Sequence, residues 1–264
     1  MKATLITGAS GGIGEAIAVR LAERKHDLLL VARNAEKLEK LCTRLSEQFG
    51  IETQFIAGDL SKASTAADIF AQTQHRGLEI EMLINNAGIG SGGEFTEIPL
   101  QSELDMLQLN VSSLVALTHL FLPQMQQRKS GTILNVGSMA SFLPVPYMAT
   151  YAASKAFIRF FTQAITEECK PYNIHVLLLS PGLTKTKFNF SAGIENEKGK
   201  ALNTDSVSAQ TAEQVADEAL KALDQRKHVV VSGTINRIGA KLLTLIPNVF
   251  LARMFARSYR KKLN

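Results

Sequence analysis

The chain has 264 residues, of which 45% are hydrophobic and 20% are charged, and it contains two cysteines and five histidines. This length suits one large α/β domain, and the composition is that of an ordinary globular protein with a sizeable core. Two isolated cysteines exclude a disulfide framework, and no histidine pair has metal-binding spacing, so we expect no bound metal.

The net charge of +5 is concentrated near the C-terminus. From residue 233 onward there are seven Lys or Arg residues and no Asp or Glu, so the rest of the chain carries +5 less 7, or −2. A near-neutral body with a basic tail lacks the positive face that nucleic-acid binding requires, so we expect no nucleic-acid partner.

The N-terminus runs directly into an apolar segment, without the hydrophobic region and cleavage site of a signal peptide. No apolar run reaches the length of a membrane span, and the best candidate, residues 242–252, is interrupted by Pro247. We therefore expect a cytoplasmic protein, and leave open its association with a membrane surface.

Apolar runs alternate with segments of helical spacing along the chain. The apolar runs are at residues 3–7, 27–32, 52–57, 82–86, 131–136, 174–180 and 228–233. The helical segments are at 12–25, 34–49, 61–76, 100–129, 149–170 and 211–225, the last opened by a Thr211–Gln214 capping box. Such alternation predicts a parallel sheet whose two faces are covered by helices.

A glycine-rich turn, "TGASGGIG", follows the first apolar run and opens the first helix. Glycines allow a sharp turn and a close approach of ligand to backbone, and a helix N-terminus binds phosphate. A turn needed only for packing is the weaker interpretation, because the turn belongs to the first strand–helix unit. We expect a dinucleotide cofactor to contact Gly8, Ser10, Gly12, Ile13 and Gly14.

The end of the second apolar run bears on the choice of cofactor. An acidic residue there favours NAD, whereas a nearby arginine accommodates the 2′-phosphate of NADP. Here Ala32 stands in the place of the carboxylate and Arg33 follows it. We predict NADP(H), the alternative being that Arg33 is a solvated residue at the start of the next helix.

Further motifs follow in order: "NNAG" at 85–88, Asn110, Ser138, "YAASK" at 151–155, and "PG" with Thr184. Together with the glycine spacing, they resemble the short-chain dehydrogenase/reductase family over residues 4 to about 186. The resemblance implies a three-layer, doubly wound Rossmann-type α/β fold with about seven parallel strands. It also implies a nicotinamide cofactor, carbonyl–alcohol redox chemistry, and assembly as a homodimer or homotetramer.

Tyr151 and Lys155 lie one helical turn apart, so their side chains share a face. A nearby cation favours a phenolate and lowers the pKa of a tyrosine that acts as general acid or base. The resemblance further implies that Lys155 binds the nicotinamide ribose. It implies that Ser138 polarises the substrate oxygen and that Asn110 disturbs its helix and supports a proton relay. We expect Tyr147, which lacks such a cation, to line the substrate site.

The same resemblance assigns the remaining cofactor contacts. Thr184 would contact the nicotinamide carboxamide, Asp59 the adenine, and residues 86–88 the adenosine ribose. The cofactor residues assigned in this way are Asp59, Asn86, Ala87, Gly88, Pro181, Gly182 and Thr184.

We expect residues 1–264 to form one domain, with 184–210 as a substrate lid and 235–264 as a basic, apolar tail. Phe188 and Phe190 would either give the lid an apolar underside, which would favour a lipophilic substrate, or belong to the core. Pro247 should divide the tail into two helices. The tail would then lie on an anionic membrane, or cover the substrate site or another subunit.

These features predict an NADPH-dependent reductase of a lipophilic ketone or aldehyde, or the reverse dehydrogenase. Steroid-like, 3-oxoacyl and other aliphatic carbonyls all fit. The alternatives are a nucleotide-binding scaffold without turnover and a peripheral membrane protein that acts through its tail.

Overall fold

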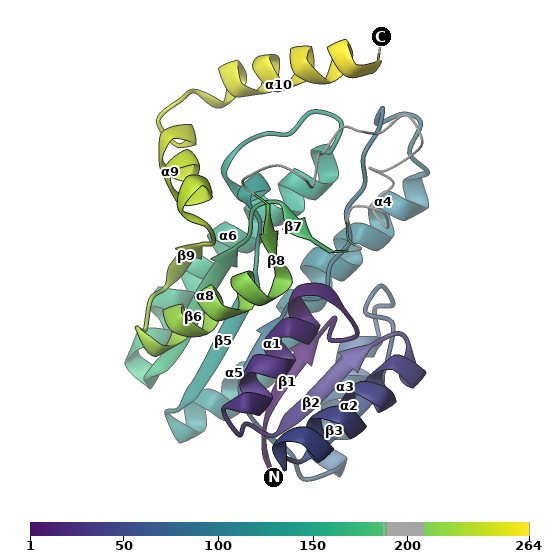
Figure 1. The fold of residues 1–264 in the computed structure, drawn as a ribbon, viewed down its shortest axis with the longest axis vertical. Helices are drawn as coiled ribbons and strands as arrows, with labels where there is room; N and C mark the ends of the chain where they lie inside the picture. The colour runs from purple at the N-terminus through teal and green to yellow at the C-terminus, as the bar shows by residue number, and fades with distance from the viewer. Residues whose placement is uncertain (187, 189–208, 264) are drawn as a thin grey trace.

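The computed structural model describes residues 1–186, 188 and 209–263. The grey trace in Figure 1 marks the others, so most of the predicted lid, including Phe190, lies outside the described residues.

The centre of the molecule is a seven-stranded sheet in the order β3-β2-β1-β4-β5-β6-β9, and every pair of neighbouring strands is parallel. This confirms the predicted sheet. The strands are β1 (Lys2–Thr7), β2 (Leu28–Ala32), β3 (Thr53–Ala57), β4 (Glu79–Asn85), β5 (Gly131–Val136), β6 (Ile174–Ser180) and β9 (Val229–Val231). A small separate sheet pairs β7 (Thr184–Lys185) with β8 (Gln210–Thr211).

Helices cover both faces of the sheet because successive strand residues point to opposite sides. In β2, Leu28 and Leu30 belong to one hydrophobic cluster, and Leu29 and Val31 belong to the other. The first cluster includes residues of α1 (Gly12–Glu23), α2 (Ala35–Phe49) and α8 (Ala212–Asp224). The second includes residues of α3 (Thr65–His75), α5 (Ser113–Arg128) and α6 (Ala149–Cys169), and these layers can be followed in Figure 1.

The order of the strands reverses between β1 and β4. The chain runs outward from β1 through β2 to β3, then crosses back to place β4 on the other side of β1. In open α/β sheets, ligands bind at such a reversal, in the crevice at the carboxyl ends of the strands. Gly8 follows β1 and Asn86 follows β4, so both lie at this position.

The predicted long helix over 100–129 contains an irregular turn. It consists of α4 (Leu100–Leu107), a π-helical turn (Gln108–Ser112) and α5. By length and composition, Leu100–Arg128 could cross a membrane, which corrects the expectation that no segment is long enough. In this fold, Leu117 and Phe121 of the segment are buried in the cluster beneath the sheet.

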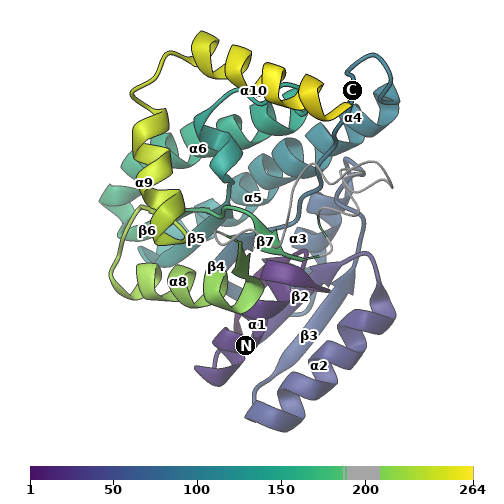
Figure 2. The same cartoon turned by 45° about the horizontal axis from the view of Figure 1, so that its top comes forward.

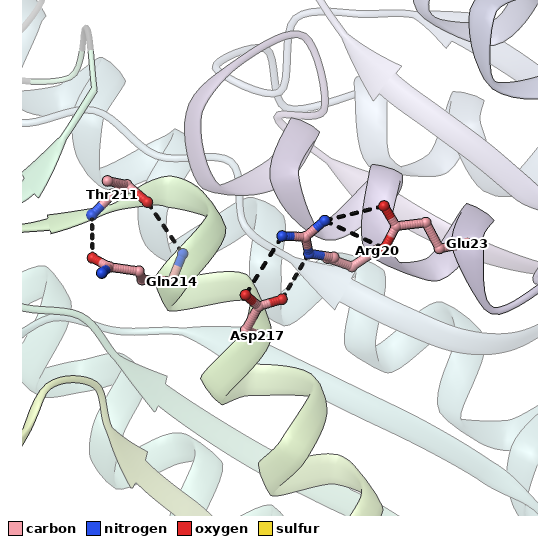
Figure 3. A network of polar contacts seen from close by, with 5 residues as sticks. All are labelled: Arg20, Glu23, Thr211, Gln214 and Asp217. Carbon is pink, nitrogen blue, oxygen red and sulfur yellow. Dashed lines mark hydrogen bonds and ion pairs between the residues drawn. The ribbon is translucent and has the colours of Figure 1, made fainter. Parts of the chain in front are cut away.

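Helices α1 and α8 are joined side by side on one face of the sheet, as Figure 3 shows. Arg20 of α1 donates to Asp217 of α8, with Nε 2.6 Å from Oδ1, and also binds Glu23 on its own helix. The predicted capping box at the start of α8 is confirmed. Thr211 Oγ1 accepts from the Gln214 amide at 3.3 Å, and Gln214 Oε1 accepts from the Thr211 amide at 2.9 Å.

The tail forms α9 (Thr234–Leu243) and α10 (Asn248–Leu263), which confirms the predicted break at Pro247. Figures 1 and 2 both place these helices beyond the carboxyl ends of the central strands. The tail and the residues that follow β1 and β4 are therefore at the same end of the molecule.

Candidate functional site

The glycine turn has the shape of a phosphate cradle. Gly8 and Gly12 have φ angles of +66° and +59°, which favour glycine, and a Cβ on Gly14 would collide with the carbonyl oxygen of Gly8. The N-cap residue of α1 is Gly11, which has no side chain that could cap the first amide groups of the helix. The first amide groups of α1 can therefore bind an anion.

The "NNAG" motif fastens β4 to this turn. Asn86 Nδ2 donates to the Thr7 carbonyl at 2.9 Å, and Thr7 Oγ1 accepts from the amides of Asn86 and Ala87 at 2.9 and 3.0 Å. Thr7 was not predicted as a site residue. The available signal was a hydroxyl residue at the end of β1, directly before the first glycine.

Arg33 and Asp59 follow neighbouring strands, β2 and β3, and Arg33 is exposed. Burial raises the pKa of Asp59, but hydrogen bonds from Ser61 and the charge of Arg33 outweigh it, so the pKa is lowered overall. Asp59 Oδ1 accepts from the Ser61 amide at 3.0 Å and from its hydroxyl at 2.8 Å. This edge therefore brings the exposed Arg33 near a carboxylate that is already held in place by hydrogen bonds.

Lys155 is buried on α6, one turn after Tyr151. Its Nζ lies 5.9 Å from the centroid of the Tyr151 ring and donates to the Val136 carbonyl at 3.0 Å. Burial lowers the pKa of Lys155 from its ordinary 10.5 to about 8. The group therefore titrates in a range where it can exchange a proton.

Tyr151 is also buried, and its hydroxyl is hydrogen-bonded to Ser138. Burial raises the pKa of Tyr151, and the hydrogen bond with Ser138 lowers it only in part. The expectation that Lys155 lowers this pKa is therefore not met in this structure. Withdrawal from water disfavours the phenolate more strongly than its neighbours favour it.

Asn110 lies in the π-helical turn and is fully engaged there. Its Oδ1 accepts from the Ile89 amide at 3.0 Å, and its Nδ2 donates to the Ile89 carbonyl at 2.9 Å and to Ser154 Oγ at 3.1 Å. A Cβ on Gly88 would lie 3.1 Å from Asn110 Oδ1 and 3.4 Å from Lys155 Nζ. Because Gly88 has no side chain, the side chains of Asn110 and Lys155 can both approach its backbone.

The segment after β6 approaches the glycine turn. The Pro181 carbonyl accepts from the Met139 amide at 2.8 Å, which links this segment to the turn that carries Ser138. Thr184 is buried in β7, and its Oγ1 donates to the Gly182 carbonyl at 3.1 Å. A Cβ on Gly12 would lie 3.3 Å from the methyl group of Thr186, so the segment covers the start of α1.

Two aromatic contacts connect α6 and the residues just before it with later parts of the chain. The ring of Phe188 lies 5.7 Å from that of Tyr151, between centroids. Tyr147, whose φ is +68°, accepts a hydrogen bond at its hydroxyl from Arg260 Nε in α10, at 3.2 Å. Arg260 was not predicted as a site residue, because its distance of 113 positions from Tyr147 gives no sequence signal.

A family model described as short chain dehydrogenase matches residues 2–197. The chain belongs to the short-chain dehydrogenase family.

Known members show how far the similarity extends. A very-long-chain 3-oxoacyl-CoA reductase of Mus musculus is 38% identical over 69% of this chain, and the match covers 59% of that protein. The chain thus spans about three-fifths of the length of this relative. A short-chain dehydrogenase from Sphingobium yanoikuyae, solved in complex with NADPH, is 32% identical with a TM-score of 0.80 and covers 88% of this chain and 87% of that one. A structure of a 7beta-hydroxysteroid dehydrogenase is 26% identical with a TM-score of 0.84, covering 97% and 96%.

The structure brings the four predicted catalytic residues into one connected group. Ser138 contacts Tyr151, Tyr151 neighbours Lys155, and Lys155 and Asn110 flank Gly88. Arg33 and Asp59 belong instead to the edge formed by β2 and β3, on the other side of β1. The predicted residues thus line the carboxyl ends of the strands from β3 to β6.

Proposed function

We propose that this protein is an NADPH-dependent reductase of a lipophilic carbonyl compound. The observation that carries the proposal is the group of Asn110, Ser138, Tyr151 and Lys155, next to a glycine turn shaped for phosphate; Asn110, Tyr151 and Lys155 are buried and Ser138 is half-buried. Within this family context, the group supplies a proton donor, a hydrogen-bond donor for the substrate oxygen and a buried cation.

The residues present fit a dinucleotide. Gly8, Gly12 and Gly14 allow the tight turn that leads into α1, whose first amides can face a pyrophosphate, and Arg33 offers a cation for a 2′-phosphate. The relative from Sphingobium yanoikuyae was solved with NADPH, which supports the same cofactor here. When bound, NADPH supplies the hydride.

The chain's own residues handle the proton. Because the pKa of Tyr151 is raised, its phenol is protonated at neutral pH, and this is the form that can give a proton to a carbonyl oxygen. Ser138 would donate a hydrogen bond to the same oxygen. With a pKa of about 8, Lys155 is mostly protonated at neutral pH and can restore the proton of Tyr151.

The apolar character of the substrate is supported by the ring of Phe188 beside Tyr151. Among lipophilic carbonyls, we propose 3-oxoacyl thioesters as the first class to test, because relatives that match about 70% of this chain are named 3-oxoacyl-CoA reductases. Steroid ketones are the second class, supported by the similarity to a hydroxysteroid dehydrogenase.

The test compares the wild type with Tyr151→Phe. NADPH oxidation is followed with 3-oxoacyl thioesters of increasing chain length, a steroid ketone and a small aldehyde. We expect the variant to lose about 10²–10⁴-fold in kcat because the proton donor is gone, while its Kd for NADPH stays nearly unchanged. Tyr172→Phe, in the short helical turn that follows the C-terminal end of α6, is the matched control.

A loss of only severalfold in Tyr151→Phe would contradict the role of Tyr151 as proton donor. Tight NADPH binding by the wild type without oxidation on any carbonyl would favour a scaffold that does not turn over.

A further inference from the structure

The two tail helices expose an unusual number of large apolar side chains. Leu245, at the corner between them, is 81% exposed, Val249 is 64% exposed and Phe250 is 61% exposed. We call the following group the tail face: Ile235, Ile238, Leu242, Leu245, Ile246, Val249, Phe250 and Met254. Exposed apolar residues that gather in this way mark an interaction site.

Contacts on the opposite side of each tail helix hold it against the body of the molecule and so determine the direction in which the tail face points. On α9, Asn236 packs against Gly182, and Gly239 faces Met139. Arg237 at the flank of α9 donates to Glu218 of α8 at 3.1 Å. On α10, Leu251 is fully buried. Because these contacts hold the helices to the body from one side, the tail face points away from it.

The spacing of the residues agrees with these contacts. Ile235, Ile238 and Leu242 repeat at intervals of three and four, which places them on one side of α9, and Leu245 follows just after the helix at the next interval of three. In α10, Val249 lies on the side opposite the buried Leu251, Phe250 lies at the flank, and Met254, three residues after Leu251, lies nearer to the side of Leu251; all three are exposed. Both helices therefore have an apolar face that the described residues of the body do not cover.

Positively charged residues border the tail face, and the tail contains no acidic residues to balance them. Arg237 and Lys241 lie on α9, and Arg253 and Arg257 lie on α10; all four are exposed. From residue 234 to the C-terminus the sequence contains no Asp or Glu. The charge therefore favours an anionic partner.

We propose that the tail face is a docking surface for an anionic lipid bilayer. The exposed aliphatic and aromatic side chains would enter the interface of the bilayer, while Lys241, Arg253 and Arg257 bind lipid phosphates and carboxylates. Figure 1 shows α10 at one end of the long axis of the molecule, so a flat surface can reach it without meeting the sheet layers.

A second copy of the chain is a poorer occupant for the same face. Two tails packed on each other would oppose cations to cations, and like charges across an interface are unfavourable. The rest of the chain, at +5 less 7, or −2, offers no strong negative field to replace the bilayer.

Docking would also bring the catalytic helix close to the membrane. Arg260 of α10 hydrogen-bonds Tyr147, which precedes Tyr151 by four residues. This consequence rests on the proposed function, since a lipophilic carbonyl is concentrated in the bilayer. The docking itself does not depend on catalysis and is measured without it.

The apolar contribution is tested by co-sedimentation of the full chain with phosphatidylcholine vesicles, with and without phosphatidylserine. Val249→Glu places a charge in the tail face, and Val229→Glu makes the same change at an exposed position at the start of β9. We expect the wild type to bind only the anionic vesicles well, Val249→Glu to lose at least about tenfold in partition, and Val229→Glu to bind like the wild type.

The electrostatic contribution is tested with variants that lose the same charge. Lys241→Gln with Arg253→Gln should weaken binding roughly 25-fold, since each cation near an anionic surface contributes a factor of about five. Lys37→Gln with Lys40→Gln, on α2, should leave binding nearly unchanged. Circular dichroism and thermal unfolding establish that all variants are folded.

Three results would overturn the proposal. One is a wild type that does not sediment with anionic vesicles, and another is tail variants that bind like their controls. The third is a change from oligomer to monomer in Val249→Glu by light scattering with vesicle binding intact, which would assign the face to a second copy. Since none of these assays uses substrate, their failure leaves the proposed reductase activity to its own test.

Discussion

Burial shifts the pKa values of the two central residues in opposite directions. The pKa of Tyr151 rises and that of Lys155 falls to about 8, because withdrawal from water disfavours the charged form of each. The sequence predicted that they share a face, but it could not show which effect dominates. Burial depends on the layers packed around α6, which come from distant parts of the chain.

The lysine gives a prediction for stability against pH, measured on the protein alone. Below pH 8 both folded and unfolded states hold the proton; between pH 8 and 10.5 only the unfolded state does, so raising pH stabilises the folded state. The wild type should therefore gain stability relative to Lys155→Met, with a slope of up to about 1.4 kcal/mol per pH unit.

Urea unfolding at several pH values measures this difference. Lys40→Met, at a position where the lysine side chain is 74% exposed, is the control. The same pH dependence in both variants would contradict the assignment of the shift to buried Lys155.

Arg33 gives a prediction for cofactor choice. Arg33→Ala should weaken the binding of NADPH by about 10- to 100-fold, the usual contribution of a hydrogen bond to a charged group. The affinity for NADH should change little. Titration of each cofactor by fluorescence measures this, with Arg44→Ala on α2 as a control of the same residue type. Equal weakening of NADPH and NADH would mean that Arg33 does not contact the 2′-phosphate.

At the scale of elements, the π-helical turn between α4 and α5 is the feature that most affects the site. It places Asn110 so that one side chain binds both backbone groups of Ile89 and also Ser154. π-helical turns are frequent at functional sites because they redirect a side chain at a cost in helix regularity. The resemblance predicted a local disturbance at Asn110, and its form as a π turn comes from the structure.

The N-terminus of α8 gives a stability prediction. Thr211 accepts from the Gln214 amide and thereby caps a helix that is joined to α1 through Asp217 and Arg20. Thr211→Ala should lower the free energy of unfolding by about 1 kcal/mol. Thr43→Ala, at an exposed position inside α2, should not lower the free energy of unfolding, because alanine is the better helix former.

Chemical denaturation of both variants measures the two changes. Equal stability of Thr211→Ala and the wild type would show that the cap contributes nothing in solution.

At the scale of the whole molecule, the predicted site residues and the exposed tail lie at the same end. Parallel strands bring their carboxyl ends to one edge, so the turns after β1, β4 and β5 meet there, and α9 and α10 lie beyond them. The predicted single domain and the predicted homodimer or homotetramer remain predictions.

The sequence by itself determined the order of strands and helices, the glycine turn, the Tyr151–Lys155 pair and the break at Pro247. These follow from local patterns: periodicity, turn chemistry and the effect of proline on a helix. Tertiary structure alone decided that Phe188 lies beside Tyr151, that Arg260 reaches Tyr147, and that one face of the tail stays exposed. Contacts between residues far apart in the chain depend on how the layers pack, and no local pattern in the chain specifies that packing.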